Sequence, residues 1–448
     1  IDMTGHDLHI QTDISPEEGT TGSQPMWTSA GIAAYREGTI TFDNPGAINI
    51  NTNINYYYGS GIRVSTAQPT DHGSHVIINN DNKPEHAVKI RGGISSAGYE
   101  MNYRALEVFT QPKSAGNSII IKGLVDIETE GGAATMFARE NGSYISVGGG
   151  RLIAKNYDSM WTNSEKARID VNMITDADGN VTDAGNNPVE IEGHATTMTT
   201  WYGTGGIINI GLTTGDSKFT GEFAGAGTQN MWLRNGAVWN NTGIVYNPWS
   251  GSNYISDISS HVTWLHGGND KSSAGNIIQN SASDLYIDNL DGCTKLFMEH
   301  DLNYVVPEFA KNPDGSDKVD KDGNKIKNEG AGQKKIFGKL GNVIIAKAHK
   351  REGKNSEISL ITDNKGLNTS SGKAADKNLV SETLNALAGK LYYEAYKNGE
   401  KNLAGTVEIA EGLTVQSATK RLETMTYKAG TGQGQYLYTP ATEDDPNP

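Results

Sequence analysis

The chain has 448 residues, of which 38 are basic and 52 are acidic, and its net charge is −14. This acidic balance argues against nucleic acid or an anionic membrane as the main partner. No apolar run comes near the 18 residues of a transmembrane helix. The 54 glycines follow no Gly-X-Y period, which excludes collagen, and recurrent Val- and Ile-rich runs argue against disorder.

After an N-terminal cap segment over residues 1–30, short strand-like runs follow one another along the chain. In each run, apolar and polar residues alternate, so that one row points inward and the other outward. Many short strands separated by turns are typical of a β-sandwich, a β-barrel or a β-solenoid. The clearest runs are 38–42, 46–50, 61–65, 117–121, 206–210, 283–287, 342–346 and 405–409.

Degenerate internal repeats distinguish between these three architectures. Residues 35–42, 136–145 and 231–239 share one pattern, in which an aromatic residue and an arginine lead into a glycine turn and an alternating strand follows. Such a unit cannot bury its apolar face alone, so copies must stack on one another. We therefore expect an all-β fold, a right-handed parallel β-helix over residues 31–427.

Two polar, turn-rich segments interrupt the pattern, at about 176–188 and 311–332, and they predict loops or hairpins that protrude from the solenoid. One helix is expected over Asp376–Leu391, because its leucines and valine recur at spacings of three and four. Together with the strands that follow, it predicts a C-terminal folding unit over about 376–427. The acidic tail 428–448 has the composition of a linker.

Several segments together resemble the passenger domain of a monomeric autotransporter adhesin (type V secretion) of a Gram-negative-type envelope. They are residues 219–223, 231–243, 383–393 and 402–413. The resemblance implies a β-helix displayed at the cell surface. It would be attached to the outer membrane only through a C-terminal β-barrel that these residues do not include. The single cysteine, Cys293, fits this interpretation, because a passenger crosses that membrane unfolded and a disulfide would obstruct it.

One segment imitates part of a calcium-binding loop. Asp320, Asp322 and Asn324 alternate before Glu329, as oxygen ligands do in such loops. The first ligand position, however, is Lys318, a cation where a carboxylate is needed. We interpret the segment first as an Asp-Gly turn in a solvated loop, with a weak calcium site as the alternative. No zinc-binding motif is present, and no other cofactor is expected.

Aromatic clusters are the candidate binding residues. Tyr56, Tyr57 and Tyr58 form one cluster, in which at least one ring must point outward if the segment is a strand. Trp201 and Tyr202 form a second one. Exposed aromatic rings stack on sugars or anchor protein partners. The alternative for each cluster is inward packing in the core.

The sequence therefore predicts a non-enzymatic surface adhesin. Its partners would be a protein or glycan on a host or bacterial surface, or a second copy of the chain in aggregation and biofilm formation. The alternative is a β-helical polysaccharide lyase or glycoside hydrolase, which needs carboxylates gathered from adjacent coils. No local pair of carboxylates stands out, so no catalytic residue is assigned.

Overall fold

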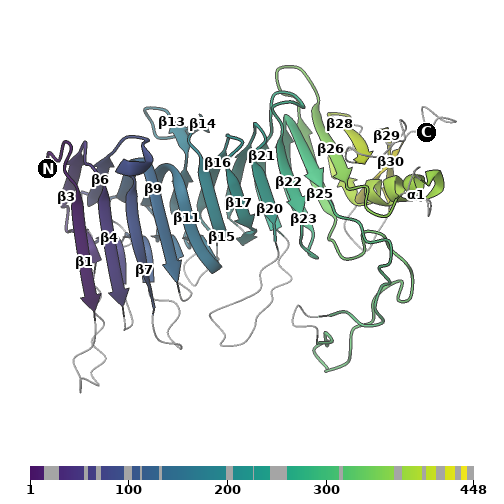
Figure 1. Cartoon of the computed structure of the whole chain (residues 1–448), viewed down its shortest axis with the longest axis horizontal. Coiled ribbons are helices and arrows are strands. Elements are labelled where there is room, and N and C mark those ends of the chain that lie inside the picture. Colours follow the sequence, from purple (N-terminus) through teal and green to yellow (C-terminus); the bar gives the residue numbers. More distant parts are fainter. Residues whose placement is uncertain are drawn as a thin grey trace. The chain divides into compact units, whose positions relative to one another are not determined.

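The structure is a computed structural model, and it describes residues 1–14, 30–54, 59–66, 72–94, 103–110, 114–130, 134–197, 205–225, 227–242, 260–311, 316–367, 376–395, 400–409, 419–428 and 435–440. The chain forms two compact units. Unit 1 is Ile1–Trp232 with Tyr246–Tyr254, and unit 2 is Leu233–Val245 with Ile255–Pro448. In the described residues of both units, most of the regular structure is β-strand (Figure 1).

The strands of unit 1 stack in three ladders, and the long strands β9, β11 and β15 bend so that each serves more than one ladder. The first ladder is β1 (Leu8–Ile14), β4 (Ile48–Ile54), β7 (Val88–Ile94), β9 (Asn117–Glu130), β11 (Ser143–Thr162), β15 (Val189–Thr197) and β17 (Lys218–Gly221). The second is β2 (Ala30–Tyr35), β5 (Gly59–Ser65), β8 (Tyr103–Phe109), β10 (Ala134–Arg139), β11, β15 and β18 (Phe223–Gly225). The third is β3 (Thr39–Asp43), β6 (His75–Asn79), β9, β11, β12 (Arg168–Val171), β16 (Ile207–Leu212) and β19 (Thr228–Leu233).

Because the strands pair in parallel and in register, side chains of the same kind lie above one another in columns. In the third ladder, one inward-facing column consists of Ile119, Ile145, Ile169 and Ile208, which lie on successive strands. None of the four is exposed. Full burial of one such side chain stabilises a fold by roughly 1.5–3 kcal/mol, so the columns form the core. Most of the outward residues beside them are polar, such as Ser146 and Arg168, and Ile120 is an apolar exception. The predicted parallel β-helix with stacked apolar rows is confirmed.

The repeats found in the sequence are corners of the coil between two strands. Each corner places residues in the left-handed region, where Gly and Asn are least strained. Glu140 (φ 68°) and Gly142 (φ 86°) turn the chain from β10 into β11, and Asn235 (φ 54°) with Gly236 (φ 79°) turns it after β19. Arg36 (φ 49°) does the same between β2 and β3. Their shared sequence pattern thus reflects shared backbone geometry.

The first predicted interruption is a hairpin. Strands β13 (Met173–Thr175) and β14 (Val181–Ala184) pair antiparallel and are joined by a turn at 176–180. They leave the third ladder directly after β12. A short 3₁₀ helix, η1 (Pro84–His86), precedes β7 elsewhere in the unit.

Unit 2 continues the same architecture. Up to β28, its ladders are parallel and pair strands from successive coils. One ladder is β20 (Val238–Asn241), β22 (Gly275–Gln279), β24 (Cys293–Phe297), β26 (Ser356–Thr362) and β28 (Leu403–Ile409). The other is β21 (Ser260–His266), β23 (Leu285–Asp291), β25 (Val343–His349) and β27 (Leu391–Tyr393).

The second predicted interruption lies between β24 and β25 and is called the protrusion, residues 299–341. It extends away from the strands of unit 2 (Figure 1) and is held together by isolated antiparallel bridges. Phe309 bridges to Lys327, and Val319 bridges to Lys325. The described part of 311–332 contains no named strand or helix, as predicted.

The predicted helix is α1 (Lys377–Ala388). Asp376 precedes it, and its carboxylate accepts the N–H groups of Asn378 (3.0 Å) and Leu379 (3.1 Å), which is how an N-cap satisfies the free donors of the first turn. Its apolar face, including Leu384 and Leu387, is buried.

The ends of the solenoid differ from the expected boundaries. Strand β1 lies inside the predicted cap 1–30, because its residues already pair in parallel with β4. At the other end, β29 (Thr419–Lys428) and β30 (Gln435–Pro440) pair antiparallel, and β30 lies inside the predicted linker 428–448. Since β29 also pairs with β28, an antiparallel strand covers the edge that the last parallel strand would leave open. None of the described helices is long and apolar enough to cross a membrane.

Candidate binding groove and polar network

The aromatic residues that the sequence singles out as binding residues cannot be placed. Tyr56, Tyr57, Tyr58, Trp201 and Tyr202 all lie outside the described residues, so their role stays a prediction. Two other clusters gather polar and aromatic side chains on the surface. One is a groove in unit 1, and the other is a hydrogen-bonded network in unit 2.

The calcium candidate in the protrusion is a compact turn. One carboxylate oxygen of Asp320 accepts the N–H groups of Asp322 and Asn324, each at 2.9 Å, while its other oxygen accepts the side-chain amide of Asn324 at 3.3 Å. These bonds to Asn324 hold the pKa of Asp320 below its usual value. The turn therefore uses this carboxylate internally, and calcium binding stays a prediction.

The groove of unit 1 is organised around a buried carboxylate, Asp170. Its side chain has no exposed surface and accepts bonds from three neighbours: Arg168 Nε (2.9 Å), Tyr144 Oη (2.9 Å) and Asn209 Nδ2 (2.7 Å). A second guanidinium nitrogen of Arg168 bonds the other carboxylate oxygen. Parallel register produces this cluster, because Tyr144 pairs with Arg168, and Asp170 pairs with Asn209, on adjacent strands of the third ladder.

Tyr144 and Arg168 form one wall of the groove. The guanidinium carbon of Arg168 lies 5.2 Å from the centre of the Tyr144 ring. Burial, reinforced by the negative charge of Asp170, raises the pKa of Tyr144 to about 12, so this phenol stays protonated and keeps donating. The third guanidinium nitrogen, Nη1, donates to the carbonyl of Gly179 at 2.7 Å. Arg168 thereby ties the tip of the β13–β14 hairpin to the solenoid.

The groove itself is a hollow of about 700 Å³ between this hairpin and the third ladder. Its lining includes Ile120, Tyr144 and Ser146 on the strands, and Asp178 and Gly179 on the hairpin tip. Volumes of this size are typical of sites for small ligands.

Two further cations, Lys122 and Lys166, line the groove, and both are exposed. Neither makes an ion pair with any residue that the structure describes. The groove residues come from three successive coils, so spacing along the chain could not have identified them. The available signal was weak: Tyr144/Ser146 and Arg168/Asp170 are polar pairs at outward positions of strands.

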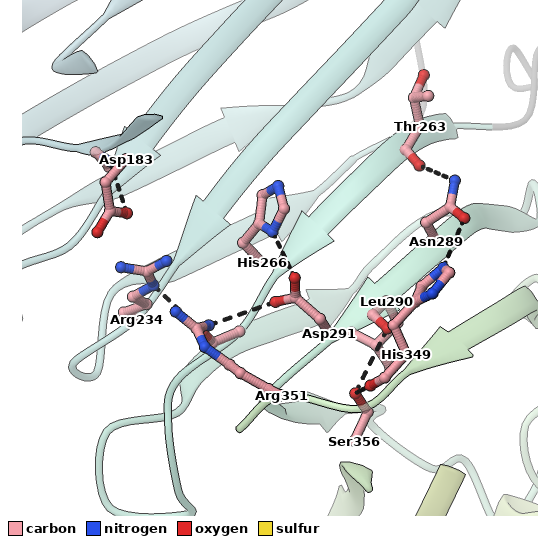
Figure 2. A network of polar contacts seen from close by, with 12 residues as sticks. Asp183, Arg234, Thr263, His266, Asn289, Leu290, Asp291, His349, Arg351 and Ser356 are labelled. Carbon is pink, nitrogen blue, oxygen red and sulfur yellow. Dashed lines mark hydrogen bonds and ion pairs between the residues drawn. The ribbon is translucent and has the colours of Figure 1, made fainter. Parts of the chain in front are cut away.

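The network of unit 2 centres on Asp291, at the end of β23 (Figure 2). His266 Nδ1 lies 2.8 Å from one carboxylate oxygen, and Arg351 Nη1 lies 3.4 Å from the other. Arg351 and Arg234 both donate to the carbonyl of Gly267, at 2.6 and 3.2 Å. Burial alone would raise the pKa of Asp291, but the bond from His266 and the neighbouring positive charges outweigh it and lower this pKa. Asp291 therefore remains charged.

An aromatic stack adjoins this network. The ring of Trp264 stacks with that of His266 (centroids 5.4 Å apart) and with that of His349 (4.8 Å). His349 also bonds the side-chain oxygen of Asn289 at 2.9 Å, and the Asn289 amide donates to the carbonyl of Thr263 (Figure 2). These side chains are half-buried, so interlocking bonds hold a rigid, preformed surface.

A third feature, again in unit 1, is the pair formed by Asp158 and His194, which are opposite each other on β11 and β15. Burial raises the pKa of Asp158 to about 6, although a hydrogen bond from Thr196 opposes the shift. Burial also lowers the pKa of His194 to about 4. The backbone N–H of Glu222 donates to His194 Nδ1 at 3.4 Å, which is compatible only with an unprotonated nitrogen there. Burial therefore favours the uncharged form of both groups.

Within the described ranges, no group of three or more His, Cys, Asp or Glu side chains is arranged to hold a metal ion. No protein-family model matches the chain, and neither the curated proteins nor the solved structures contain a significant match to it.

Proposed function

We propose that the chain is a non-enzymatic adhesin of the autotransporter passenger type, displayed at the cell surface. It binds a protein or a glycan on a host or bacterial surface, or a second copy of itself. The groove of unit 1 is the observation that carries this proposal. It is concave and open to solvent, its lining combines apolar surface with charged side chains, and its walls come from adjacent coils of a solenoid.

Rigidity supports a binding role. Asp170 connects Arg168, Tyr144 and Asn209, and Arg168 holds the hairpin tip, so both walls of the groove are fixed before a ligand arrives. A preformed site avoids the cost of ordering side chains on binding, about 0.5–1.5 kcal/mol for each immobilised side chain. The network around Asp291 in unit 2 is preformed in the same way.

Beads coated with the purified chain test the proposal. We expect them to adhere to host epithelial cells or to bacterial cells, and adhesion should fall when soluble chain competes. Sedimentation velocity of the chain at rising concentration measures self-association separately. No adhesion to any cell type, together with a monomer at all concentrations, contradicts the proposal.

A glycan-degrading enzyme is the second candidate, and the Asp158–His194 pair favours it. A carboxyl group that keeps its proton to about pH 6 suits a general acid in glycosidic cleavage. Incubation with acidic and neutral polysaccharides, followed by assays for reducing ends and unsaturated products, tests it. Turnover that disappears in Asp158→Asn would establish the enzyme and displace the adhesin proposal.

A further inference from the structure

We propose that the groove of unit 1 binds an acidic oligosaccharide, with Lys122 and Lys166 each pairing with one of its carboxylate or sulfate groups. The register places the two lysines at opposite ends of the strands that line the groove. This inference rests on the proposed adhesin function and specifies the ligand class of one of its sites. It depends on three properties of the groove, namely charge, surface chemistry and rigidity.

The charge of the groove is opposite to that of the whole chain. Lys122, Lys166 and Arg168 face it, whereas its acidic groups are Asp170, buried behind the wall, and Asp178, on the hairpin tip. Asp170 already neutralises Arg168 through two bonds. The two lysines are therefore the charges available to a ligand, in a chain whose net charge is −14. Two cations match one or two anionic groups, and the surrounding negative charge disfavours a long polyphosphate chain.

The surface between the charges suits a sugar ring. Ile120 is half-buried and lines the groove, and on the next strand Ser146 lies opposite it while Tyr144 lies two positions away. Ile120 and Tyr144 offer apolar surface to the C–H face of a pyranose, while the Ser146 side chain and the hairpin backbone offer polar groups to its hydroxyls. A volume of about 700 Å³ accommodates a short oligosaccharide rather than a single inorganic ion.

Arg168 is a positioning residue in this site. Its guanidinium donates hydrogen bonds to the carboxylate of Asp170 and to the carbonyl of Gly179. These bonds set the distance between the solenoid and the hairpin. Asp178 lies on the same tip and lines the groove, where its carboxylate opposes an anionic ligand. Removing this negative charge should strengthen binding, an effect that mere structural damage does not produce.

Isothermal titration of the purified chain tests the proposal with four probes: an oligogalacturonate hexamer (carboxylate), a chondroitin sulfate hexasaccharide (carboxylate and sulfate), a neutral isomaltohexaose, and inorganic sulfate. We expect one or both acidic hexasaccharides to bind, with affinity falling several-fold between about 50 and 300 mM NaCl, because salt screens exposed charges. The neutral sugar and free sulfate should bind at least about tenfold more weakly than the best acidic probe. Equal binding of the neutral sugar overturns the proposal.

Three variants locate the site. The double change Lys122→Glu and Lys166→Glu should lower affinity for the acidic probe by at least about tenfold, because two attractive contacts become repulsive. Lys321→Glu, an equally exposed lysine of the protrusion, is the single charge-reversal control and should leave affinity unchanged. Asp178→Asn should raise affinity about two- to fivefold. Unchanged binding in the double variant overturns the proposal.

The result separates this inference from the adhesin function. If the wild-type chain adheres to cells but binds no acidic probe, the adhesin proposal stands and the assignment of the groove fails. If acidic probes bind through the two lysines but no cell adheres, the groove assignment stands and the adhesin proposal fails.

Discussion

Asp170 and Asp158 are both carboxylates on the outer side of unit 1, yet their surroundings differ in kind. Asp170 is fully buried and accepts bonds from an arginine, a phenol and an amide. Asp158 is half-buried, it accepts a hydrogen bond from the hydroxyl of Thr196, and the residue opposite it on the next strand is His194. A buried charge persists where donors replace water, whereas a carboxyl with one donor keeps its proton to higher pH. The surroundings of Asp170 therefore fix its neighbours in place, whereas the surroundings of Asp158 shift the pH at which it loses its proton.

The largest expected effect on stability comes from removing the carboxylate of Asp170. Asp170→Ala leaves Arg168, Tyr144 and Asn209 without their shared acceptor, and it should lower the free energy of unfolding by on the order of 3 kcal/mol. Denaturant unfolding measures this loss. As a control, Asp170→Asn keeps an acceptor and should lose less. A loss below about 0.5 kcal/mol for the alanine variant contradicts the role given to Asp170.

The protonation of Asp158 and His194 should make the free energy of unfolding depend on pH. The folded chain keeps the Asp158 proton to about pH 6, while an unfolded Asp loses it near 3.8, so this residue lowers stability as pH rises through that window. His194 acts oppositely: its pKa of about 4, against 6.5 when unfolded, raises stability as pH rises from 4 to 6.5. The two contributions nearly cancel in the wild-type chain.

Single substitutions should expose each contribution. Relative to wild type, Asp158→Asn should gain about 2 kcal/mol of unfolding free energy between pH 4 and 6.5, and His194→Gln should lose a similar amount. Denaturant unfolding at half-unit pH steps measures both slopes. The wild-type chain and the two variants share all other titrating groups, so the test compares each variant's change in unfolding free energy with that of wild type. Two variants that run parallel to wild type would show that neither pKa is shifted.

A smaller effect should follow from trimming one donor of Asp170. Tyr144→Phe removes the phenol oxygen but keeps the ring beside Arg168, and it should lower the unfolding free energy by about 1–2 kcal/mol. The same variant should retain binding to acidic sugars in the groove, because the apolar ring remains. Denaturant unfolding and titration of one sample give both results, and a loss as large as that of Asp170→Ala would be inconsistent with shared donors.

The hairpin tip offers a matched pair of still smaller changes. Asp176 caps its turn as Asp320 does in the protrusion, accepting two backbone N–H groups in the sequence Asp-x-Asp-Gly-Asn. Among the contacts of the described residues, only those of the first turn reach the solenoid face, where Arg168 donates to the carbonyl of Gly179. Asp176→Ala should therefore lower the melting temperature by a few degrees and weaken groove binding, whereas Asp320→Ala should leave both unchanged. Equal effects would mean that attachment to the solenoid is irrelevant.

The smallest effect concerns calcium. Because the carboxylate of Asp320 is already used by its own turn, millimolar calcium should not raise the melting temperature. A calcium-dependent rise that disappears in Asp322→Ala would instead establish the weak site that the sequence left open.

Much of the fold was predictable because strand alternation and corner geometry are local properties. The runs at 38–42, 117–121 and 342–346 all fall on strands, and the helix pattern at 376–391 falls on α1 with Asp376 as its cap. The antiparallel end of unit 2 was missed, because alternation does not tell parallel from antiparallel strands.

The groove was not predictable for a different reason. Lys122, Tyr144 and Lys166 line one groove only because successive coils stack in one register, and single residues along the chain do not reveal that register. The aromatic residues that the sequence favoured remain untested, since they lie outside the described part of the chain. Local pattern thus predicted the scaffold, while the site depends on alignment between coils.

The isoleucine column of the third ladder has a mechanical consequence. Ile145 and Ile169 are 24 positions apart, while Ile169 and Ile208, separated by the hairpin, are 39 apart. Pulled along the chain, each coil leaves only its neighbour, so the molecule should yield in steps rather than all at once. At roughly 3.4 Å of contour per residue, a plain coil releases about 80 Å and the hairpin coil about 130 Å. Unit 1 would thus lengthen under load by unequal increments, and could absorb shear while its remaining coils stay folded.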